Sequence, residues 1–104
     1  MSILVRSMSN VEAVHFWSPT CGPCRTIKPA IEGLKEEFPQ VTWTSVNTKE
    51  DPNRFAQRLG VQVVPTIVFF CNGKEVGRHS GASVGIYYTL IRKALSACGA
   101  TSTQ

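Results

Sequence analysis

Apolar and polar positions near the start of the chain predict a strand followed by a helix. Residues 11–17 form a β-prone run that ends at a turn signal at residues 18–20. After Cys21, apolar side chains recur at the spacing of one helical face: Ile27, Ile31, Leu34 and Phe38. Pro39 is expected to end this helix. Pro29 inside it removes one backbone hydrogen bond and should kink the axis.

The middle of the chain predicts a second strand and a short helix. Residues 41–47 alternate apolar and polar side chains, which is typical of a half-buried strand. Asp51 followed by Pro52 matches a helix cap with proline at the first helical position. We therefore expect a short helix that begins there and ends at Gly60.

Two further β-prone runs, residues 66–71 and 74–78, flank the Asn-Gly pair at 72–73. Asn-Gly between such runs is the strongest two-residue hairpin signal in the chain. With the final helix described next, the order of elements is β-α-β, a short helix, then β-β-α. This order predicts an α/β fold with a mixed sheet, helices on both faces and a right-handed first crossover.

The last part of the chain predicts a helix with a broad apolar face. Ser83 is placed to cap it, and Gly99 to end it. The expected apolar face consists of Ile86, Tyr87, Leu90, Ile91, Ala94, Leu95 and Cys98. We expect one domain over residues 1–98 and a loose polar tail over residues 99–104.

The length of 104 residues fits one compact domain, and no apolar run is long enough to cross a bilayer. The first ten residues contain only the apolar triplet Ile3-Leu4-Val5, too short for the core of a secretory signal, so we expect a cytoplasmic protein that does not bind membranes. The formal net charge is +4, but Lys and Arg are spread along the chain. A nucleic-acid binder concentrates them on one face, so this pattern indicates a mildly basic surface and no nucleic-acid partner.

Four cysteines would permit two disulfides in a secreted protein, but their spacing argues for another use. Cys21 and Cys24 form a C-x-x-C pair beside a βαβ pattern, which indicates redox chemistry. Cys71 is predicted to be an inert buried thiol, and Cys98 a more exposed thiol that could form an intermolecular disulfide. A structural zinc site needs four ligands, usually two close pairs, and only one close pair is present, so no metal site is expected.

The C-x-x-C pair falls where a predicted strand ends and a helix begins. Reactive groups of open α/β sheets collect at this position. The helix start offers unpaired N–H groups and the positive end of the macrodipole, which favour a thiolate at Cys21. Cys24 lies one turn further and is expected to be more buried, within reach of the Cys21 sulfur. Pro23 between them limits the freedom of the backbone.

Several segments together resemble the thioredoxin family over roughly residues 12 to 97, in the family's order. They are Phe16-Trp17, Cys21-Gly22-Pro23-Cys24, Ile27, Pro29, Val64-Pro65-Thr66 and Gly81-Ala82. The resemblance implies the thioredoxin fold, with a four- to five-stranded mixed sheet, and a monomeric protein disulfide reductase without a cofactor. It implies that Cys21 attacks a substrate disulfide and that Cys24 resolves the mixed disulfide. The Gly-Pro dipeptide between the cysteines resembles that of reductases more than that of oxidases or isomerases.

The resemblance also implies a docking surface for disulfide-containing protein substrates. The family's proline at the position of Pro65 is cis and faces the cysteines, and its backbone neighbourhood would bind an extended substrate segment. The residues expected at this surface are Thr20, Gly22, Pro23, Val64, Gly81 and Ala82. The implied electron donor is thioredoxin reductase, a flavoprotein that uses NADPH, or another thiol reductant.

The chain departs from the family pattern at the proton-handling position. His15 stands where thioredoxins usually carry a buried aspartate, and Ser45 appears at the position of the lysine that pairs with it. We hypothesise that His15 serves as the base for Cys24, since imidazole titrates near neutrality. The alternative is a core histidine with satisfied hydrogen bonds and no catalytic role.

Two further departures concern the docking surface and the N-terminus. Thr20 replaces the usual tryptophan, and residues 14–19 are similar to the thioredoxin-like domains of multidomain monothiol glutaredoxins. Only about ten residues precede the first strand, so residues 3–6 are expected to form an edge strand or an irregular cover in place of the usual strand and crossover helix. Trp17 is predicted to be core in preference to a substrate contact, and Trp43 to pack in the core or at an edge.

These departures leave open an alternative of another class, a thioredoxin-like module that docks partners without turning over disulfides. The intact groups that the exchange reaction requires, Cys21, Cys24, Pro23 and Pro65, favour the enzyme.

Overall fold

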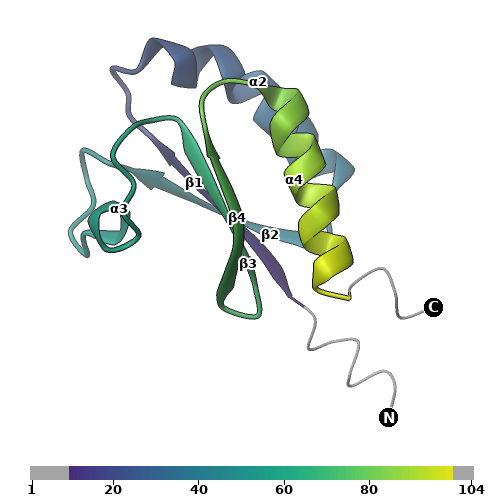
Figure 1. Ribbon diagram of the computed structural model, residues 1–104. Helices are drawn as coiled ribbons and strands as arrows, with labels where there is room; N and C mark the ends of the chain where they lie inside the picture. The colour runs from purple at the N-terminus through teal and green to yellow at the C-terminus, as the bar shows by residue number, and fades with distance from the viewer. Residues whose placement is uncertain (1–9, 100–104) are drawn as a thin grey trace.

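The computed structural model describes residues 10–99 of the chain (Figure 1). The expectations for residues 3–6 and for the tail beyond Gly99 lie outside these residues. Within them, no helix has the length and apolar character needed to span a bilayer. The elements are β1 (Val11–Trp17), α2 (Gly22–Glu37), β2 (Val41–Asn47), α3 (Phe55–Arg58), β3 (Thr66–Cys71), β4 (Lys74–Ser80) and α4 (Val84–Ala97).

The four strands form one mixed sheet in the order β2-β1-β3-β4. β1 pairs parallel with β2 and antiparallel with β3, and β3 pairs antiparallel with β4. α2 and α4 lie against one face of the sheet and α3 lies on the other side (Figure 1). The predicted α/β order and mixed sheet are therefore confirmed.

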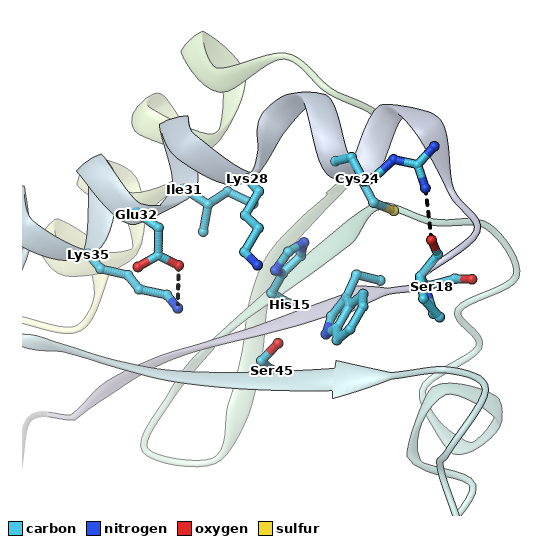
Figure 2. A pocket seen from close by; sticks show the side chains of 11 residues that line it. His15, Ser18, Cys24, Lys28, Ile31, Glu32, Lys35 and Ser45 are labelled. Carbon is cyan, nitrogen blue, oxygen red and sulfur yellow. Dashed lines mark hydrogen bonds and ion pairs between the residues drawn. The ribbon is translucent and has the colours of Figure 1, made fainter.

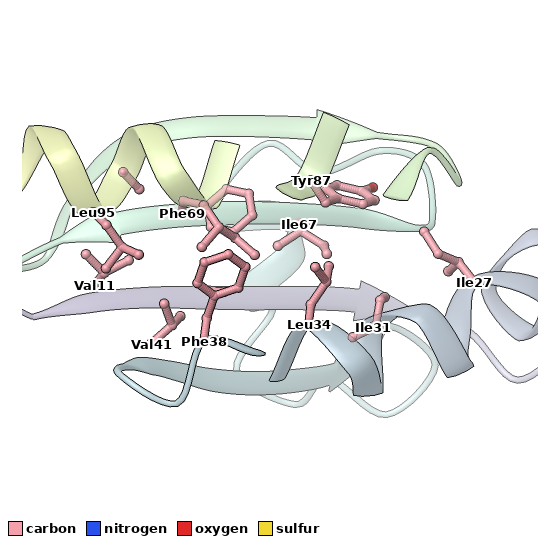
Figure 3. Packing of buried hydrophobic residues seen from close by; sticks show 13 residues of the cluster. Val11, Ile27, Ile31, Leu34, Phe38, Val41, Ile67, Phe69, Tyr87 and Leu95 are labelled. Atoms are coloured by element: carbon pink, nitrogen blue, oxygen red, sulfur yellow. The ribbon is translucent and has the colours of Figure 1, made fainter. Parts of the chain in front are cut away.

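Alternation along the strands divides the buried side chains between the two faces of the sheet. The larger core lies between the sheet and the α2–α4 layer (Figure 3). Its buried members are Val11, Ala13, Ile27, Ile31, Leu34, Phe38, Val41, Ile67, Phe69, Tyr87, Ile91, Ala94 and Leu95. The smaller core, on the α3 side, is built on Val14, Phe16 and Val68. Because His15 alternates with Val14 and Phe16, its side chain lies on the α2 side of β1.

The hairpin and the cap of the last helix form as the sequence predicts. Asn72 and Gly73 have φ angles of 51° and 87°, the left-handed pair that a tight two-residue hairpin requires. β4 runs two residues beyond the predicted end at Arg78. The Ser83 side chain accepts a hydrogen bond from the N–H of Ile86 and so caps α4.

Two details of the predicted helices are wrong. α3 begins at Phe55 and not at Asp51-Pro52, because the residues before it form turns and Arg54 takes a left-handed φ of 53°. The Asp51 carboxylate still caps this helix, accepting from the N–H groups of Phe55 at 3.0 Å and Ala56 at 2.9 Å. Ile86, predicted on the apolar face of α4, is 43% exposed, because it lies to one side of the helical face on which Tyr87, Ile91, Ala94 and Leu95 are buried.

The predictions for Cys71 and Cys98 are also wrong. These residues form an intramolecular disulfide, with Cα atoms 5.5 Å apart, between the end of β3 and the C-terminal end of α4. The hairpin reverses the chain, and α4 then packs back along β3, which brings together two cysteines 27 residues apart. Neither cysteine is an isolated thiol in this structure.

Candidate active site

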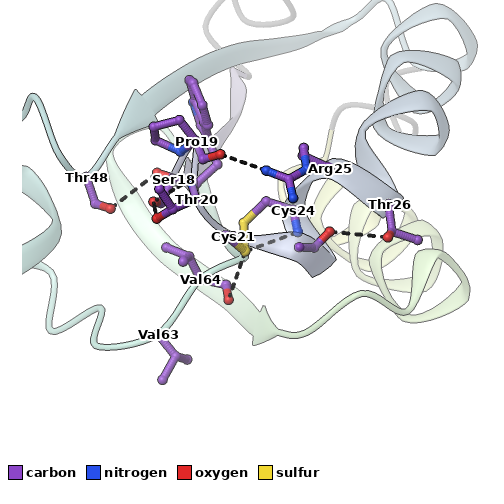
Figure 4. The surroundings of a disulfide bond; sticks show 12 residues. Ser18, Pro19, Thr20, Cys21, Cys24, Arg25, Thr26, Thr48, Val63 and Val64 are labelled. Carbon is purple, nitrogen blue, oxygen red and sulfur yellow. Dashed lines mark hydrogen bonds between the residues drawn. A yellow bond between two sulfur atoms is a disulfide. The ribbon is translucent and has the colours of Figure 1, made fainter.

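Cys21 and Cys24 are joined by a disulfide at the N-terminus of α2 (Figure 4). Cys21 is the N-cap residue, in an extended conformation, and the N–H of Cys24 points at the Cys21 sulfur over 3.1 Å. Cys21 is partly exposed, whereas Cys24 is 4% exposed. In the reduced form this N–H and the helix dipole would favour the thiolate of Cys21 over its thiol.

The turn before the helix fixes the position of the pair. The N–H of Cys21 donates to the carbonyl of Ser18 at 3.1 Å, and the hydroxyls of Ser18 and Thr20 lie 3.1 Å apart. The Arg25 guanidinium reaches back from α2 and donates to the Pro19 carbonyl at 2.9 Å. These hydrogen bonds therefore stabilise the first turn of α2 and the preceding loop against each other.

The loop before β3 brings a second predicted segment to the disulfide. The Val64–Pro65 peptide bond is cis, as the resemblance implies. The carbonyl oxygen of Val64 lies 3.7 Å from the Cys21 sulfur (Figure 4). Pro65 is fully buried. Val63, just before this pair, is 57% exposed.

The Gly81-Ala82 segment lies beside Val64-Pro65. The N–H of Gly81 donates to the Pro65 carbonyl at 2.8 Å, and Gly81 takes a φ of 128°, which favours glycine. The Tyr87 hydroxyl donates to the Gly81 carbonyl at 2.6 Å from inside the core. The structure thus brings Val64-Pro65 to both the cysteine pair and Gly81. Thr20, Gly22, Pro23 and Ala82 are exposed around them.

His15 lies behind the disulfide and not on this surface. It is 8% exposed and stands opposite Ser45 in the pairing of β1 with β2. Its Nε2 atom is buried and makes no hydrogen bond to the part of the chain that the structure describes. Burial lowers the pKa of His15 to about 4, with a smaller contribution from the positive charge of Lys35, while Glu32 opposes the shift. The imidazole is therefore neutral at pH 7.

His15 and Cys24 line the same cavity, which has a volume of about 340 Å³ (Figure 2). Trp17, predicted to be core, is half-buried on the wall of this cavity. Sequence reasoning missed the contribution of α2 to the cavity, although the spacing contained a signal. Residues three or four apart lie on one helical face, and the α2 residues that line the cavity follow this rule: Cys24, Arg25, Lys28, Ile31, Glu32 and Lys35.

Trp43 and the possible metal ligands complete the description of this region. Trp43 packs partly buried against the larger core, as predicted. Within residues 10–99, no group of three or more His, Cys, Asp or Glu side chains is arranged to hold a metal ion.

The amino-acid sequence of this chain is similar to those of known proteins. Residues 3–90 match the family model described as "Thioredoxin". The chain is 41% identical over 70 residues to the chloroplastic Thioredoxin M-type of Pisum sativum, covering 66% of this chain and 40% of that protein. It is 36% identical over 87 residues to the mitochondrial Thioredoxin-2 of Schizosaccharomyces pombe, covering 84% of this chain and 65% of that protein.

A solved structure is similar in fold over most of its length. The thioredoxin of Fasciola hepatica superposes with a TM-score of 0.78 at 33% identity, covering 88% of each chain. The matched part of the chain spans only 40% and 36% of the first two curated relatives, the pea protein and the chloroplastic Thioredoxin M4 of Arabidopsis thaliana.

Proposed function

This chain belongs to the thioredoxin family, and we propose that it is a protein disulfide reductase that works through Cys21 and Cys24. The observation that carries this proposal is the position of the pair. A partly exposed cysteine at a helix N-cap, a buried partner one turn later and the backbone of a cis proline lie together. These are the groups that thiol–disulfide exchange with an extended protein segment needs.

In the proposed reaction, the reduced pair gives two electrons to a substrate disulfide. The Cys21 thiolate attacks one substrate sulfur, a Cys21–substrate disulfide forms, and the other substrate sulfur leaves as a thiolate that takes up a proton. Cys24 then loses its proton and attacks the Cys21 sulfur, which releases the second substrate thiolate. The pair is left as the disulfide seen in the structure.

Each cysteine has the environment that its proposed step requires. Cys21 is accessible, and the N–H of Cys24, 3.1 Å from its sulfur, would stabilise the attacking thiolate. Cys24 is buried, so its thiol would keep its proton until the mixed disulfide has formed. Substrate would dock across residues 20–23, Val64-Pro65 and Gly81-Ala82, where Val63 adds exposed apolar surface.

We assign the proton of Cys24 to His15, because both line one cavity. A pKa of about 4 keeps the imidazole neutral and able to accept a proton at pH 7, although it makes His15 a weak base. Negative charge that develops on Cys24 would raise the pKa of His15 during the step. His15→Ala should therefore slow resolution of the mixed disulfide more than the initial attack, measured by stopped flow. Equal slowing of both steps would assign His15 a structural role only.

Turnover of insulin disulfides with dithiothreitol tests the proposed activity. The wild type should accelerate reduction, and Cys21→Ser should return it to the rate of dithiothreitol alone, because the attacking sulfur is missing. Circular dichroism of both proteins controls for folding. A folded wild type with no activity above the reductant would replace this proposal with the partner-docking module.

The electron donor and the location follow from the same proposal. A dithiol donor, thioredoxin reductase or another thiol reductant, would restore the reduced pair. Relatives of this chain carry both chloroplastic and mitochondrial names, so family membership does not select a compartment, and the cytoplasmic location stays a prediction.

A further inference from the structure

A buried tyrosine on α4 connects the larger core to the proposed substrate surface. The side chain of Tyr87 is fully buried, at the same end of this core as Ile27 (Figure 3). A buried hydroxyl needs a hydrogen-bond partner, because it has given up its contacts with water. The partners of Tyr87 are backbone groups of the segment between β4 and α4. Its hydroxyl donates to the carbonyl of Gly81 at 2.6 Å and lies 3.1 Å from the carbonyl of His79.

The surroundings of Tyr87 keep its hydroxyl a donor. Burial raises the pKa of Tyr87 to about 12, so the hydroxyl keeps its proton at pH 7. The ring of His79 packs edge-on against the ring of Tyr87, with the ring centroids 5.4 Å apart. The direction of the hydroxyl toward Gly81 is therefore fixed by packing as well as by the hydrogen bond.

Gly81 is held from two sides by its backbone. Its carbonyl accepts from Tyr87, and its N–H donates to the carbonyl of Pro65 at 2.8 Å. Its φ of 128° is a conformation that favours glycine, and a Cβ added here would lie 3.5 Å from the Nε2 atom of His79. Because glycine has no side chain to pack, these backbone hydrogen bonds determine where Gly81 lies.

Two hydroxyl groups connect the residue before Gly81 to the same loop. Thr66 is 1% exposed, and its hydroxyl donates to the carbonyl of Val63 at 2.7 Å. The hydroxyl of Ser80 lies 2.6 Å from that of Thr66. Hydrogen bonds therefore connect Ser80 and Gly81 to both ends of the segment 63–65, which carries the cis proline.

We propose that Tyr87 is a positioning residue for the docking of protein substrates. Its hydroxyl fixes Gly81, which through its bond to Pro65 fixes the backbone beside Cys21. The proposal rests on the proposed function, since it concerns the binding of an extended substrate segment at that surface. Because Tyr87 is fully buried, it does not touch the substrate. Its hydroxyl therefore affects how well a protein substrate docks and leaves the reactivity of the Cys21 sulfur unchanged.

Reduction of a protein disulfide and of a small disulfide by the same variant tests the proposal. With insulin as substrate and dithiothreitol as donor, Tyr87→Phe should raise KM about fivefold and leave kcat within about twofold. Hydroxyethyl disulfide offers no extended segment to dock, so stopped-flow measurement should show its rate within about twofold of the wild type. An unchanged KM for insulin, or an equal loss with both substrates, would overturn the proposal.

Two control variants separate positioning from a general loss of stability. Tyr88→Phe removes the same atom from the half-buried side of α4 and should leave KM unchanged. Ile91→Val shortens a fully buried side chain of the same helix, so it should destabilise the core and also leave KM unchanged. An increase in KM in Ile91→Val equal to that in Tyr87→Phe would mean that core stability controls docking, and would contradict the role of the hydroxyl.

Hydrogen exchange measured by NMR gives a readout that does not depend on activity. In Tyr87→Phe, the amide of Gly81 should exchange at least about tenfold faster, whereas the amide of Ile67 in β3 should change much less. Equal acceleration of both amides would indicate global destabilisation and overturn the proposal. A folded wild type that does not accelerate insulin reduction would remove the proposed function and the positioning role together. An active Tyr87→Phe variant with an unchanged KM would remove the positioning role alone.

Discussion

The two disulfides of this protein lie at opposite ends of its fold and differ in the length of the chain they close and in their surroundings. Cys21–Cys24 spans three residues at the start of α2, next to a cavity and a cis proline. Cys71–Cys98 spans 27 residues and joins the far end of β3 to the end of α4 (Figure 1). Cys98 packs against the larger core, and its sulfur lies 3.9 Å from the Asn10 carbonyl.

This difference separates chemistry from stability. A short loop at a helix N-terminus restricts the unfolded chain little, but its sulfurs have N–H groups and a substrate surface beside them. A long loop between two core elements restricts the unfolded chain strongly. Neither Cys71, at the end of β3, nor Cys98, just after α4, lies at the N-terminus of a described helix, where N–H groups would stabilise a thiolate. We therefore expect the first disulfide to turn over and the second to stabilise the fold.

The largest expected effect separates the two pairs in activity. Cys21→Ser should lower the protein-dependent rate of insulin reduction, after the rate with dithiothreitol alone is subtracted, by at least about 1,000-fold, because the attacking sulfur is lost. The double variant Cys71→Ser/Cys98→Ser should stay within about twofold of the wild type at a temperature where it is folded. Parallel assays with dithiothreitol measure both. A large loss in the double variant would mean that the distal pair takes part in electron transfer, and the comparison would fail.

The second largest effect concerns stability, where the Cys71–Cys98 disulfide should matter more than Cys21–Cys24. Removing Cys71–Cys98 should lower the free energy of unfolding by about 3.5 kcal/mol, from the chain entropy of its 27-residue separation. Cys21→Ser/Cys24→Ser should cost about 1.5 kcal/mol, because its loop is so short. Urea unfolding of both double variants under non-reducing conditions measures the difference. Equal losses would show that the distal disulfide adds no more than the local one.

The third effect concerns pH and the active-site end alone. The pKa of His15 is about 4 in the folded protein and about 6.5 in the unfolded chain. The unfolded chain therefore binds more protons between these values, so stability is complete above about pH 6.5 and falls toward pH 4. Urea unfolding should show a loss of about 2–3 kcal/mol from His15 between pH 7 and pH 4.5.

His15→Asn is the control for this pH dependence, because it keeps the other titrating groups and lacks the imidazole. Between pH 7 and pH 4.5, the free energy of unfolding of this variant should fall by about 2–3 kcal/mol less than that of the wild type. The same slope in both proteins would show that His15 is accessible to protons in the folded state.

The smallest effect tests the link between the core and the active-site end. Tyr87 donates from α4 to the carbonyl of Gly81 at 2.6 Å and contacts that of His79 at 3.1 Å, and burial raises its pKa to about 12. Tyr87→Phe should lower stability by about 1–2 kcal/mol, because buried carbonyls lose their donor. Thermal unfolding measures this change. Tyr88→Phe, on the half-buried side of the same helix, is the matched control and should change little.

Local patterns in the sequence predicted the elements that depend on neighbouring residues. The bounds of β1, β2 and β3, the Asn72-Gly73 turn and the Ser83 cap all follow from alternation, φ preferences or a side chain within a few positions. The start of α3 did not, because Asp51 caps the helix from four residues away across a turn. The prediction for Ile86 was wrong because helical spacing indicates a broad apolar face, whereas packing onto the sheet decides how much of its width is buried.

The sequence by itself determined the reactive pair, its place at a helix start and the family to which the chain belongs, since these rest on short motifs in order. Only the tertiary structure decided which distant residues meet. It joined Cys71 to Cys98, gathered His15 and Cys24 into one cavity with the lysines of α2, and set Val64-Pro65 against Cys21. The physical reason is that such contacts depend on how helices pack onto the sheet, and no spacing along the chain encodes that packing directly.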